Sequence, residues 1–107
     1  AAPMSYEIKL TRRALDDLDR LAGESRAEID HLTRRFFEAL ARLEAMPLSC
    51  GLAYEDRLFR EEIRHLLFKV HKGRSFRALF SIRGDAVWVL AVRGPGERPI
   101  RPEDLDD

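Results

Sequence analysis

Residues 75–92, SFRALFSIRGDAVWVLAV, constrain the fold more than any other stretch of the chain. From 76 to 83, Phe, Ala, Phe and Ile alternate with Arg, Leu, Ser and Arg, which is the period-two pattern of a strand with two unlike faces. Arg83-Gly84-Asp85 then favours a tight turn, because Gly tolerates a positive φ and Asp is a turn former. Residues 86–92 are a nearly unbroken apolar run, typical of a central strand covered on both faces. We therefore predict a hairpin whose second strand is central and whose Trp88 is largely buried.

The N-terminal half has the pattern of one short strand and two helices. Residues 6–10 alternate, Thr11 can cap a helix that continues to Ala22, and Gly23 suits the end of that helix. A second helix follows at once, because residues 25–28 read Ser-Arg-Ala-Glu, a capping box. Its apolar side chains recur at steps of three and four residues: Ile29, Leu32, Phe36, Leu40 and Leu43. The short connection predicts an antiparallel helix pair.

The remaining segments complete an α+β pattern. Residues 48–56 have no period and predict a loop, whereas residues 58–70 are strand-like. Residues 71–74, His-Lys-Gly-Arg, form a basic turn before the hairpin, and residues 97–107 predict a loosely held polar tail. The order is strand, two helices, then three strands. It predicts a small, mostly antiparallel sheet with the antiparallel helix pair packed on one face.

Length and composition indicate a single cytoplasmic domain. Of the 107 residues, 1–3 precede Met4 and have the look of a cloning remnant, so we expect one domain over residues 4–107. No apolar run approaches the roughly 20 residues of a membrane span, and we expect no membrane association. The single cysteine, Cys50, excludes a disulfide framework and suits a reducing cytoplasm.

The formal net charge of zero conceals a strong asymmetry along the chain. Residues 57–101 hold eleven Lys or Arg against four Asp or Glu, whereas the remainder holds eight against fifteen. A basic half carried on strands indicates a polyanion or an acidic partner at the sheet. The alternative is that the two halves neutralise each other within one fold.

Eight basic residues lie on the C-terminal strands and in the turns that join them: Arg64, Lys69, His71, Lys72, Arg74, Arg77, Arg93 and Arg98. Neighbouring strands are about 4.8 Å apart, so these side chains can converge on one patch. Guanidinium groups match phosphate oxygens in pairs, and such a patch could bind a nucleic-acid backbone or stabilise charge on a phosphate during reaction. Any one of them could instead be an ordinary solvated surface charge.

Other kinds of site have weak support in the sequence. No histidine has a Cys, Asp or Glu partner at zinc-like spacing, so we predict neither a metal nor a cofactor. Gly94-Pro95-Gly96 lacks the pattern of a phosphate-binding loop, and no Ser/His/Asp or Cys/His set is indicated. Phe76, Phe80 and Trp88 could stack on bases, although burial in the core is the simpler assignment.

Three segments together resemble the RelE/ParE superfamily of toxins from bacterial type II toxin–antitoxin systems. They are residues 60–69, REEIRHLLFK, residues 75–82, SFRALFSI, and residues 87–93, VWVLAVR, with Arg98-Pro99 close behind. The resemblance covers nearly the whole chain from Met4, and its motifs are specific to the fold more than to the activity. In the family the middle block usually reads Gly-Tyr-Arg, where this chain has Ser75-Phe76-Arg77.

The resemblance implies a toxin held inactive by a co-expressed antitoxin protein. RelE-like members cut mRNA on the ribosome without metal, through basic side chains on the sheet, whereas ParE-like members inhibit DNA gyrase. Arg77 matches the family's strand arginine, Arg93 or Arg98 matches the basic position after the last strand, and Lys69 and Lys72 lie where nuclease members carry basic residues. The expected catalytic residues are Arg77, Arg93, Arg98, Lys69 and His71, and either His71 or a lysine of lowered pKa would serve as the acid or base. The expected RNA-binding residues are Arg64, Lys72 and Arg74.

Two departures from the nuclease members accompany this resemblance. Many relatives carry a His after the last strand, where this chain has Gly94, and the C-terminal Tyr of RelE has no counterpart, since the only tyrosines are Tyr6 and Tyr54. Three hypotheses therefore stay open: a ribosome-dependent mRNA endonuclease, a DNA gyrase inhibitor without nuclease activity, and a non-catalytic module that binds a partner. Clustering of Arg77, Arg93 and Lys69 on an exposed face would favour the first.

Overall fold

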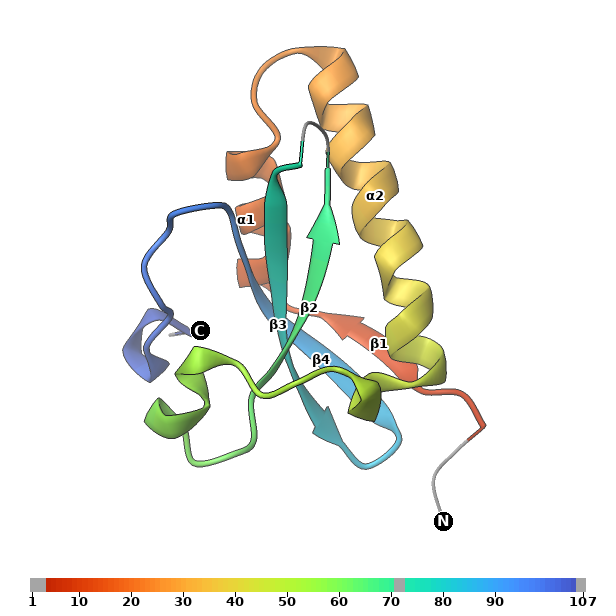
Figure 1. Ribbon diagram of the computed structural model, residues 1–107, viewed down its shortest axis with the longest axis vertical. Coiled ribbons are helices and arrows are strands. Elements are labelled where there is room, and N and C mark those ends of the chain that lie inside the picture. Colours follow the sequence, from red (N-terminus) through yellow and green to blue (C-terminus); the bar gives the residue numbers. More distant parts are fainter. Residues whose placement is uncertain (1–3, 71–72, 106–107) are drawn as a thin grey trace.

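The computed structural model describes residues 4–70 and 73–105, which form an α+β fold with two helices and one four-stranded sheet (Figure 1). The elements follow one another in the expected order: β1 Glu7–Leu10, α1 Arg12–Leu21, α2 Arg26–Ala45, β2 Arg64–Lys69, β3 Ser75–Arg83 and β4 Ala86–Arg93.

Both helices begin at the caps expected from the sequence. The Thr11 hydroxyl accepts a hydrogen bond from the Ala14 amide at 3.1 Å, and the Ser25 hydroxyl accepts one from the Glu28 amide at 3.0 Å. Between the helices Gly23 has a φ of 81°, a conformation that favours glycine, and the chain reverses there. The helices therefore form the predicted antiparallel pair (Figure 1).

The sheet has the order β1-β4-β3-β2, so β4 is an inner strand as its apolar run predicts. The pairs β2–β3 and β3–β4 are antiparallel, but β1 lies parallel to β4, which makes the sheet mixed. Because β1 has only four residues, α1 lies beside the rest of β4. There the buried carboxylate of Asp17 accepts a hydrogen bond from the Val92 amide at 2.9 Å.

The pairing of β3 with β4 contains a register shift, which changes the face of the sheet toward which the β4 side chains point. Leu79 pairs with Ala91 and Phe80 with Val89, so Leu90 is an extra residue in β4. As a result Val89 and Val92 both lie in the larger core. That core packs the helix pair on one face of the sheet, with Leu32, Phe36, Leu40 and Leu43 buried on α2; Ile29, expected in the same stripe, is exposed instead.

The opposite face of the sheet carries a second, smaller core. Leu79, Leu90 and Ala91 pack there against Ala53, Ile63 and Ile100, with Trp88 partly buried at the margin. The prediction of a loosely held C-terminal tail is therefore wrong. Ile100 is only 2% exposed, its amide is hydrogen-bonded within the fold, and Leu105 also packs against the smaller core. These two apolar side chains attach the segment to the sheet.

The expected loop and the strand after it also differ from their predicted bounds. Along the chain, two short 3-10 helices connect α2 to β2: η1 Pro47–Ser49 and η2 Tyr54–Leu58. Strand β2 starts at Arg64 rather than near residue 58. A third 3-10 helix, η3 Pro102–Leu105, lies in the C-terminal segment beside η2 (Figure 1). The described part of the chain contains no helix with the length and hydropathy of a membrane span.

Candidate functional site

Arg77, the strongest candidate from the sequence, is engaged in a buried ion pair. Its Nη1 and Nη2 donate to Oε1 and Oε2 of Glu55 at 3.0 and 2.9 Å. The Glu55 side chain is fully buried and that of Arg77 is 14% exposed. Alternation places Arg77 on the face away from the helix pair, as expected, but this face is covered by η2 and the C-terminal segment and is not open.

Glu55 also holds the C-terminal segment, because its Oε2 accepts a hydrogen bond from the Ile100 amide at 3.0 Å. Burial alone would raise the pKa of Glu55, but the hydrogen bonds from Arg77 and Ile100 outweigh it and lower that pKa. The carboxylate is therefore ionised at neutral pH and joins η2, β3 and the C-terminal segment at one point.

Two aromatic rings flank the guanidinium of Arg77. Its Cζ lies 5.1 Å from the centroid of the Tyr54 ring, and the Tyr54 ring meets that of His65 edge-on with centroids 5.9 Å apart. Burial and the charge of Arg77 both lower the pKa of His65, so this imidazole is neutral at neutral pH. Tyr54 itself is 68% exposed.

Arg93 lies directly opposite Arg77 on the neighbouring strand, and it too is buried. Its Nε and Nη2 donate to the Arg98 carbonyl oxygen at 3.1 and 2.6 Å, and its Nη1 lies 3.7 Å from Glu97. Because these contacts occupy the guanidinium group, Arg93 fixes the backbone of the C-terminal segment rather than presenting a cation to solvent.

The other basic residues singled out in the sequence are spread over the molecule. Lys69 is exposed at the end of β2, and Arg98 is exposed with its Nη1 3.6 Å from Asp104. Arg64 pairs with Glu62 at 2.9 Å and donates to the Cys50 carbonyl oxygen, which ties β2 to the preceding loop. His71 and Lys72 lie outside the described residues. The structure thus brings Arg77 and Arg93 together, but both guanidinium groups are hydrogen-bonded to other groups of the protein.

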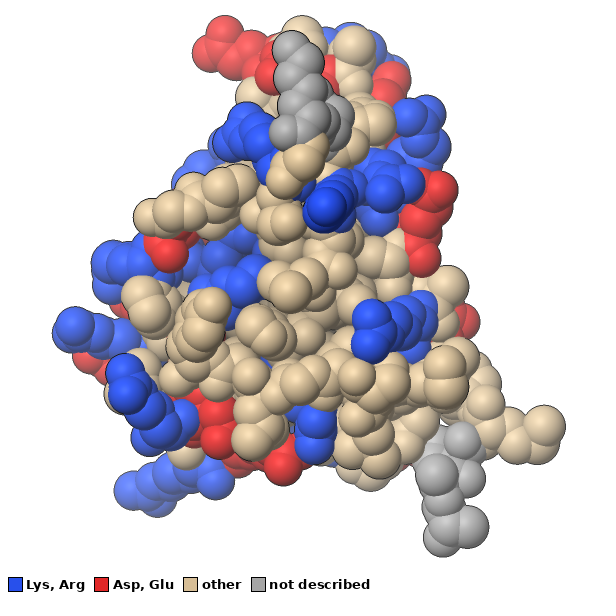
Figure 2. Space-filling model, in the orientation of Figure 1, with Lys and Arg blue, Asp and Glu red and all other residues tan. Residues whose placement is uncertain are grey.

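Figure 2 shows the face formed by η2, the C-terminal segment and the β2–β3 side of the sheet. Lys and Arg side chains gather along the left of this view, over the two 3-10 helices seen there in Figure 1, with Asp and Glu between them. Much of the centre of this view is uncharged. Over the whole molecule, the exposed large hydrophobic side chains include Leu52, Tyr54 and Leu67. The basic residues do not form one continuous patch on this face.

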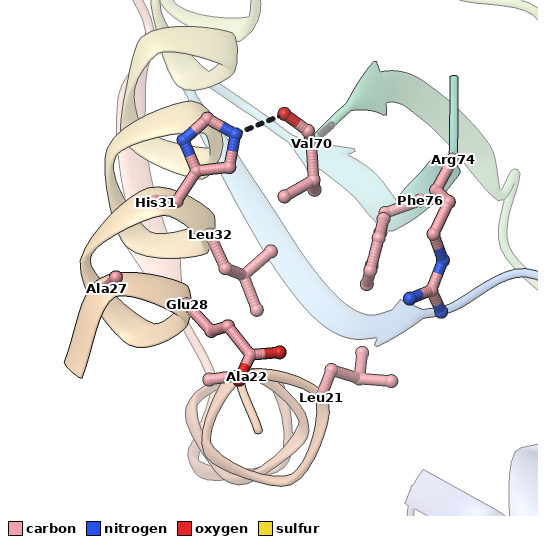
Figure 3. Close-up of a pocket in the computed structure, with 9 residues that line it drawn as sticks. All are labelled: Leu21, Ala22, Ala27, Glu28, His31, Leu32, Val70, Arg74 and Phe76. Atoms are coloured by element: carbon pink, nitrogen blue, oxygen red, sulfur yellow. Dashed lines mark hydrogen bonds between the residues drawn. The ribbon is translucent and has the colours of Figure 1, made fainter. Parts of the chain in front are cut away.

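A separate apolar pocket of about 240 Å³ lies where the turn between α1 and α2 approaches the start of β3 (Figure 3). Leu21, Leu32 and Phe76 line its interior, the carboxylate of Glu28 points into it from α2, and the side chain of Arg74 lies at its edge. The guanidinium of Arg74 lies 5.8 Å from the Phe76 ring centroid, and no carboxylate of the described residues pairs with it. We refer to this cavity as the helix-turn pocket.

Metal binding and thiol reactivity both depend on His, Cys, Asp and Glu side chains. Within residues 4–70 and 73–105, no three His, Cys, Asp or Glu side chains lie together in a way that could hold a metal ion. Cys50 is buried, and this burial raises the pKa of its thiol, so the thiol is protonated at neutral pH.

Sequence reasoning missed Glu55, the residue that organises this region. It lies in a stretch without periodicity, and an acidic residue there has the appearance of a solvated loop side chain. The alternation of β3 offered a usable signal. It places Arg77 on the opposite face from Phe76 and Ala78, and if that face is also covered, the buried arginine needs a carboxylate partner.

The sequence matches the model of the family described as "ParE toxin of type II toxin-antitoxin system, parDE" over residues 8–98. No curated protein sequence matches the chain. Among solved structures, the fold is similar to a chain of the archaeal RelE–RelB complex from Pyrococcus horikoshii OT3. The TM-score is 0.53 at 19% identity, and the match covers 89% of this chain and 100% of that chain. The chain belongs to the ParE toxin family of type II toxin–antitoxin systems.

Proposed function

We propose that this toxin acts by binding and inhibiting DNA gyrase and does not cleave RNA. The observation that carries this proposal is the two-point ion pair between Arg77 and the fully buried Glu55. A positive group that stabilises a phosphate in transit must reach it, and both terminal nitrogens of Arg77 already donate to a carboxylate. The activity implied by the ParE side of the resemblance needs no such group.

The segment after the last strand supports the same proposal. Many relatives carry a His after the last strand, where this chain has Gly94, and a Cβ built at Gly94 would lie 2.9 Å from Cδ2 of Leu21. Nonbonded carbons do not approach this closely, so a side chain there would require the terminal methyl group of Leu21 to shift. The Gly94 amide is also committed, since it donates to Oε1 of Glu97 at 2.8 Å.

RNA cleavage on the ribosome is the second candidate, and one observation favours it. Arg77 and Arg93 are direct cross-strand partners, and Leu67, which also pairs with Arg77, lies two residues before the exposed Lys69. If Glu55 and the C-terminal segment moved away, these three cations would share one face of the sheet. The nuclease activity would then require that movement before each reaction.

The partner that holds this toxin inactive is proposed to be an antitoxin protein with an amphipathic, acidic segment. A type II system implies such a partner, and the solved structure with a similar fold is described as a RelE–RelB complex. The helix-turn pocket would take an apolar side chain of that segment, and Arg74 would pair with one of its carboxylates.

Two assays on the purified chain separate the two activities. We expect gyrase to lose DNA supercoiling activity when the toxin is added, and mRNA on programmed ribosomes to stay intact. Addition of the antitoxin should restore supercoiling, which controls for non-specific inhibition. Cleaved mRNA together with unaffected supercoiling would overturn the proposal and establish the nuclease in its place.

A further inference from the structure

An open pocket of about 540 Å³ lies between η2 and the C-terminal segment, on the side of the sheet away from the helix pair. One wall carries Tyr54, Arg57 and Leu58, and the other carries Arg98, Arg101 and Pro102. The volume lies in the range of about 300–1,000 Å³ that small-molecule sites occupy. We refer to this cavity as the arginine pocket. The residues matched to the family model end at 98, so the wall with Arg101 and Pro102 extends beyond them.

We propose that the arginine pocket binds a nucleotide, with its phosphates on the three arginines and its base stacked on Tyr54. This site goes beyond the proposed inhibition of gyrase.

The cations of this pocket are available for an anion. Among the described residues, no carboxylate pairs with Arg57 or Arg101, and Arg98 has only the 3.6 Å contact with Asp104. Glu103 is the acidic residue of the lining, so the arginines outnumber it. Guanidinium groups hold phosphate oxygens through two hydrogen bonds at a time, which suits a site with several of them.

Tyr54 gives the site a rigid aromatic surface. Tyr54 is 68% exposed, and its ring contacts the Arg77 guanidinium at 5.1 Å and the His65 ring edge-on. A ring held in this way stacks on a base without losing further freedom, and stacking on an exposed aromatic is the usual means of holding a base. An acidic peptide could pair with the arginines but would not use this ring.

The two walls of the pocket are fixed from beneath by the buried ion pair. Glu55 follows Tyr54 directly, and its carboxylate accepts the hydrogen bond from Ile100, which lies between Arg98 and Arg101. Arg93 in turn holds the Arg98 carbonyl oxygen. The arginines therefore project from backbone that is already in place before a ligand arrives, which limits the entropy lost on binding.

The test is a titration of the purified chain at low salt with ATP free of metal ions, followed by adenosine and inorganic triphosphate. We expect ATP to bind, adenosine to show no binding, and triphosphate to bind about tenfold or more weakly than ATP, since it lacks a base. Absence of ATP binding, or equal affinity for ATP and triphosphate, would overturn the proposal.

Variants then locate the site. Arg57→Ala with Arg101→Ala should weaken ATP binding about tenfold or more, and Tyr54→Leu should weaken it about tenfold, whereas Tyr54→Phe should preserve it. The matched control, Arg26→Ala with Arg34→Ala, removes the same charge from the exposed side of α2 and should have no effect. An equal loss in the control pair would mean that only net charge matters, and the assignment of the pocket would be wrong.

A free nucleotide and a nucleotide within a strand offer the same chemistry, and a short oligothymidylate distinguishes them. If the oligonucleotide displaces ATP and binds more tightly, the ligand is a single strand; if ATP binds more tightly, it is a free nucleotide. In both cases the affinity must depend on Tyr54 and the two arginines. Displacement of ATP by poly-glutamate at equal charge would contradict the proposal, because the site would then recognise only negative charge.

Discussion

At the scale of single residues, the carboxylate of Glu55 is the group on which most of the C-terminal half depends. Glu55→Gln keeps an acceptor for the Ile100 amide but leaves Arg77 buried without its counter-charge. We expect the free energy of unfolding to fall by about 3–5 kcal/mol, the usual cost of breaking a buried ion pair. Chemical denaturation measures it. The double variant Glu55→Gln with Arg77→Met should recover much of the loss, and an unchanged single variant would show that the pair does not contribute to stability.

The ion pair between Glu55 and Arg77 should make the free energy of unfolding decrease at acid pH. The folded pKa of Glu55 lies below its unfolded value of about 4.3, so its contribution is fully present above that pH. It declines as the pH drops below about 4.3 and is lost once the pH passes the folded pKa. Unfolding free energies measured between neutral and acid pH should therefore fall less steeply in the double variant than in the unaltered chain. Parallel curves for the two proteins would contradict this.

What the sequence predicts at this scale is the face of a side chain and not its partner. Strand alternation places Arg77 on the face away from Phe76 and Ala78, and the structure agrees. Its partner lies 22 residues away on a short 3-10 helix, and no local pattern encodes that contact. For the same reason the position of Arg93 at the end of a strand predicts an exposed cation, although Arg93 is buried.

At the scale of elements, the inner strands should tolerate truncation least where a side chain is completely buried. Phe80 on β3 is fully buried between sheet and helices, so Phe80→Ala should cost about 3–5 kcal/mol. Trp88 on β4 is only partly buried, with Arg83 5.4 Å from its ring centroid. Trp88→Ala should therefore cost less than Phe80→Ala in the same denaturation experiment. The reverse order would mean that the smaller core contributes more to stability than its burial indicates.

The C-terminal segment should come away from the sheet when Ile100, its most deeply buried apolar side chain, is made polar. Ile100→Asp places a charge in the smaller core beside Glu55, and we expect residues 94–105 to detach while the helix pair stays folded. Limited digestion with a glutamate-specific endoproteinase should then cleave first after Glu97 and Glu103, with helical circular dichroism retained. Ile100→Val is the matched control and should stay resistant. Equal resistance of both variants would show that the arginine contacts alone hold the segment.

Elements defined by local signals are the ones that sequence predicts well. Thr11, Ser25 and Gly23 determine where the helices begin and end through contacts within a few residues. The apolar run of β4 likewise predicts an inner strand. The parallel register of β1 depends instead on residues about eighty positions away, and the packing of the tail depends on Ile100 and Leu105, two apolar residues in an otherwise polar stretch.

At the scale of the whole molecule, the separation of charge along the chain should govern how fast the antitoxin associates. We expect the association rate to fall with increasing salt, because opposite charges steer the encounter. Arg74→Glu at the helix-turn pocket should slow association and speed dissociation, as measured by surface-immobilised antitoxin. Arg12→Glu makes the same change of charge on α1, outside that pocket, and should affect only the association rate. Identical effects of the two variants would show that the antitoxin does not bind at the helix-turn pocket.

The pairing of β1 with β4 also determines when this protein can fold during its own synthesis. Residues 7–10 leave the ribosome early, but their partners are residues 86–89 of the inner strand, which leave it late. Until then β3 lacks its neighbour on one side and β1 has no strand to pair with. Native pairing between such distant segments is slow to form and cannot begin on an incomplete chain. The native sheet therefore cannot form until residues 86–89 have been synthesised, and a nascent chain that lacks them does not yet have the fold of the toxin.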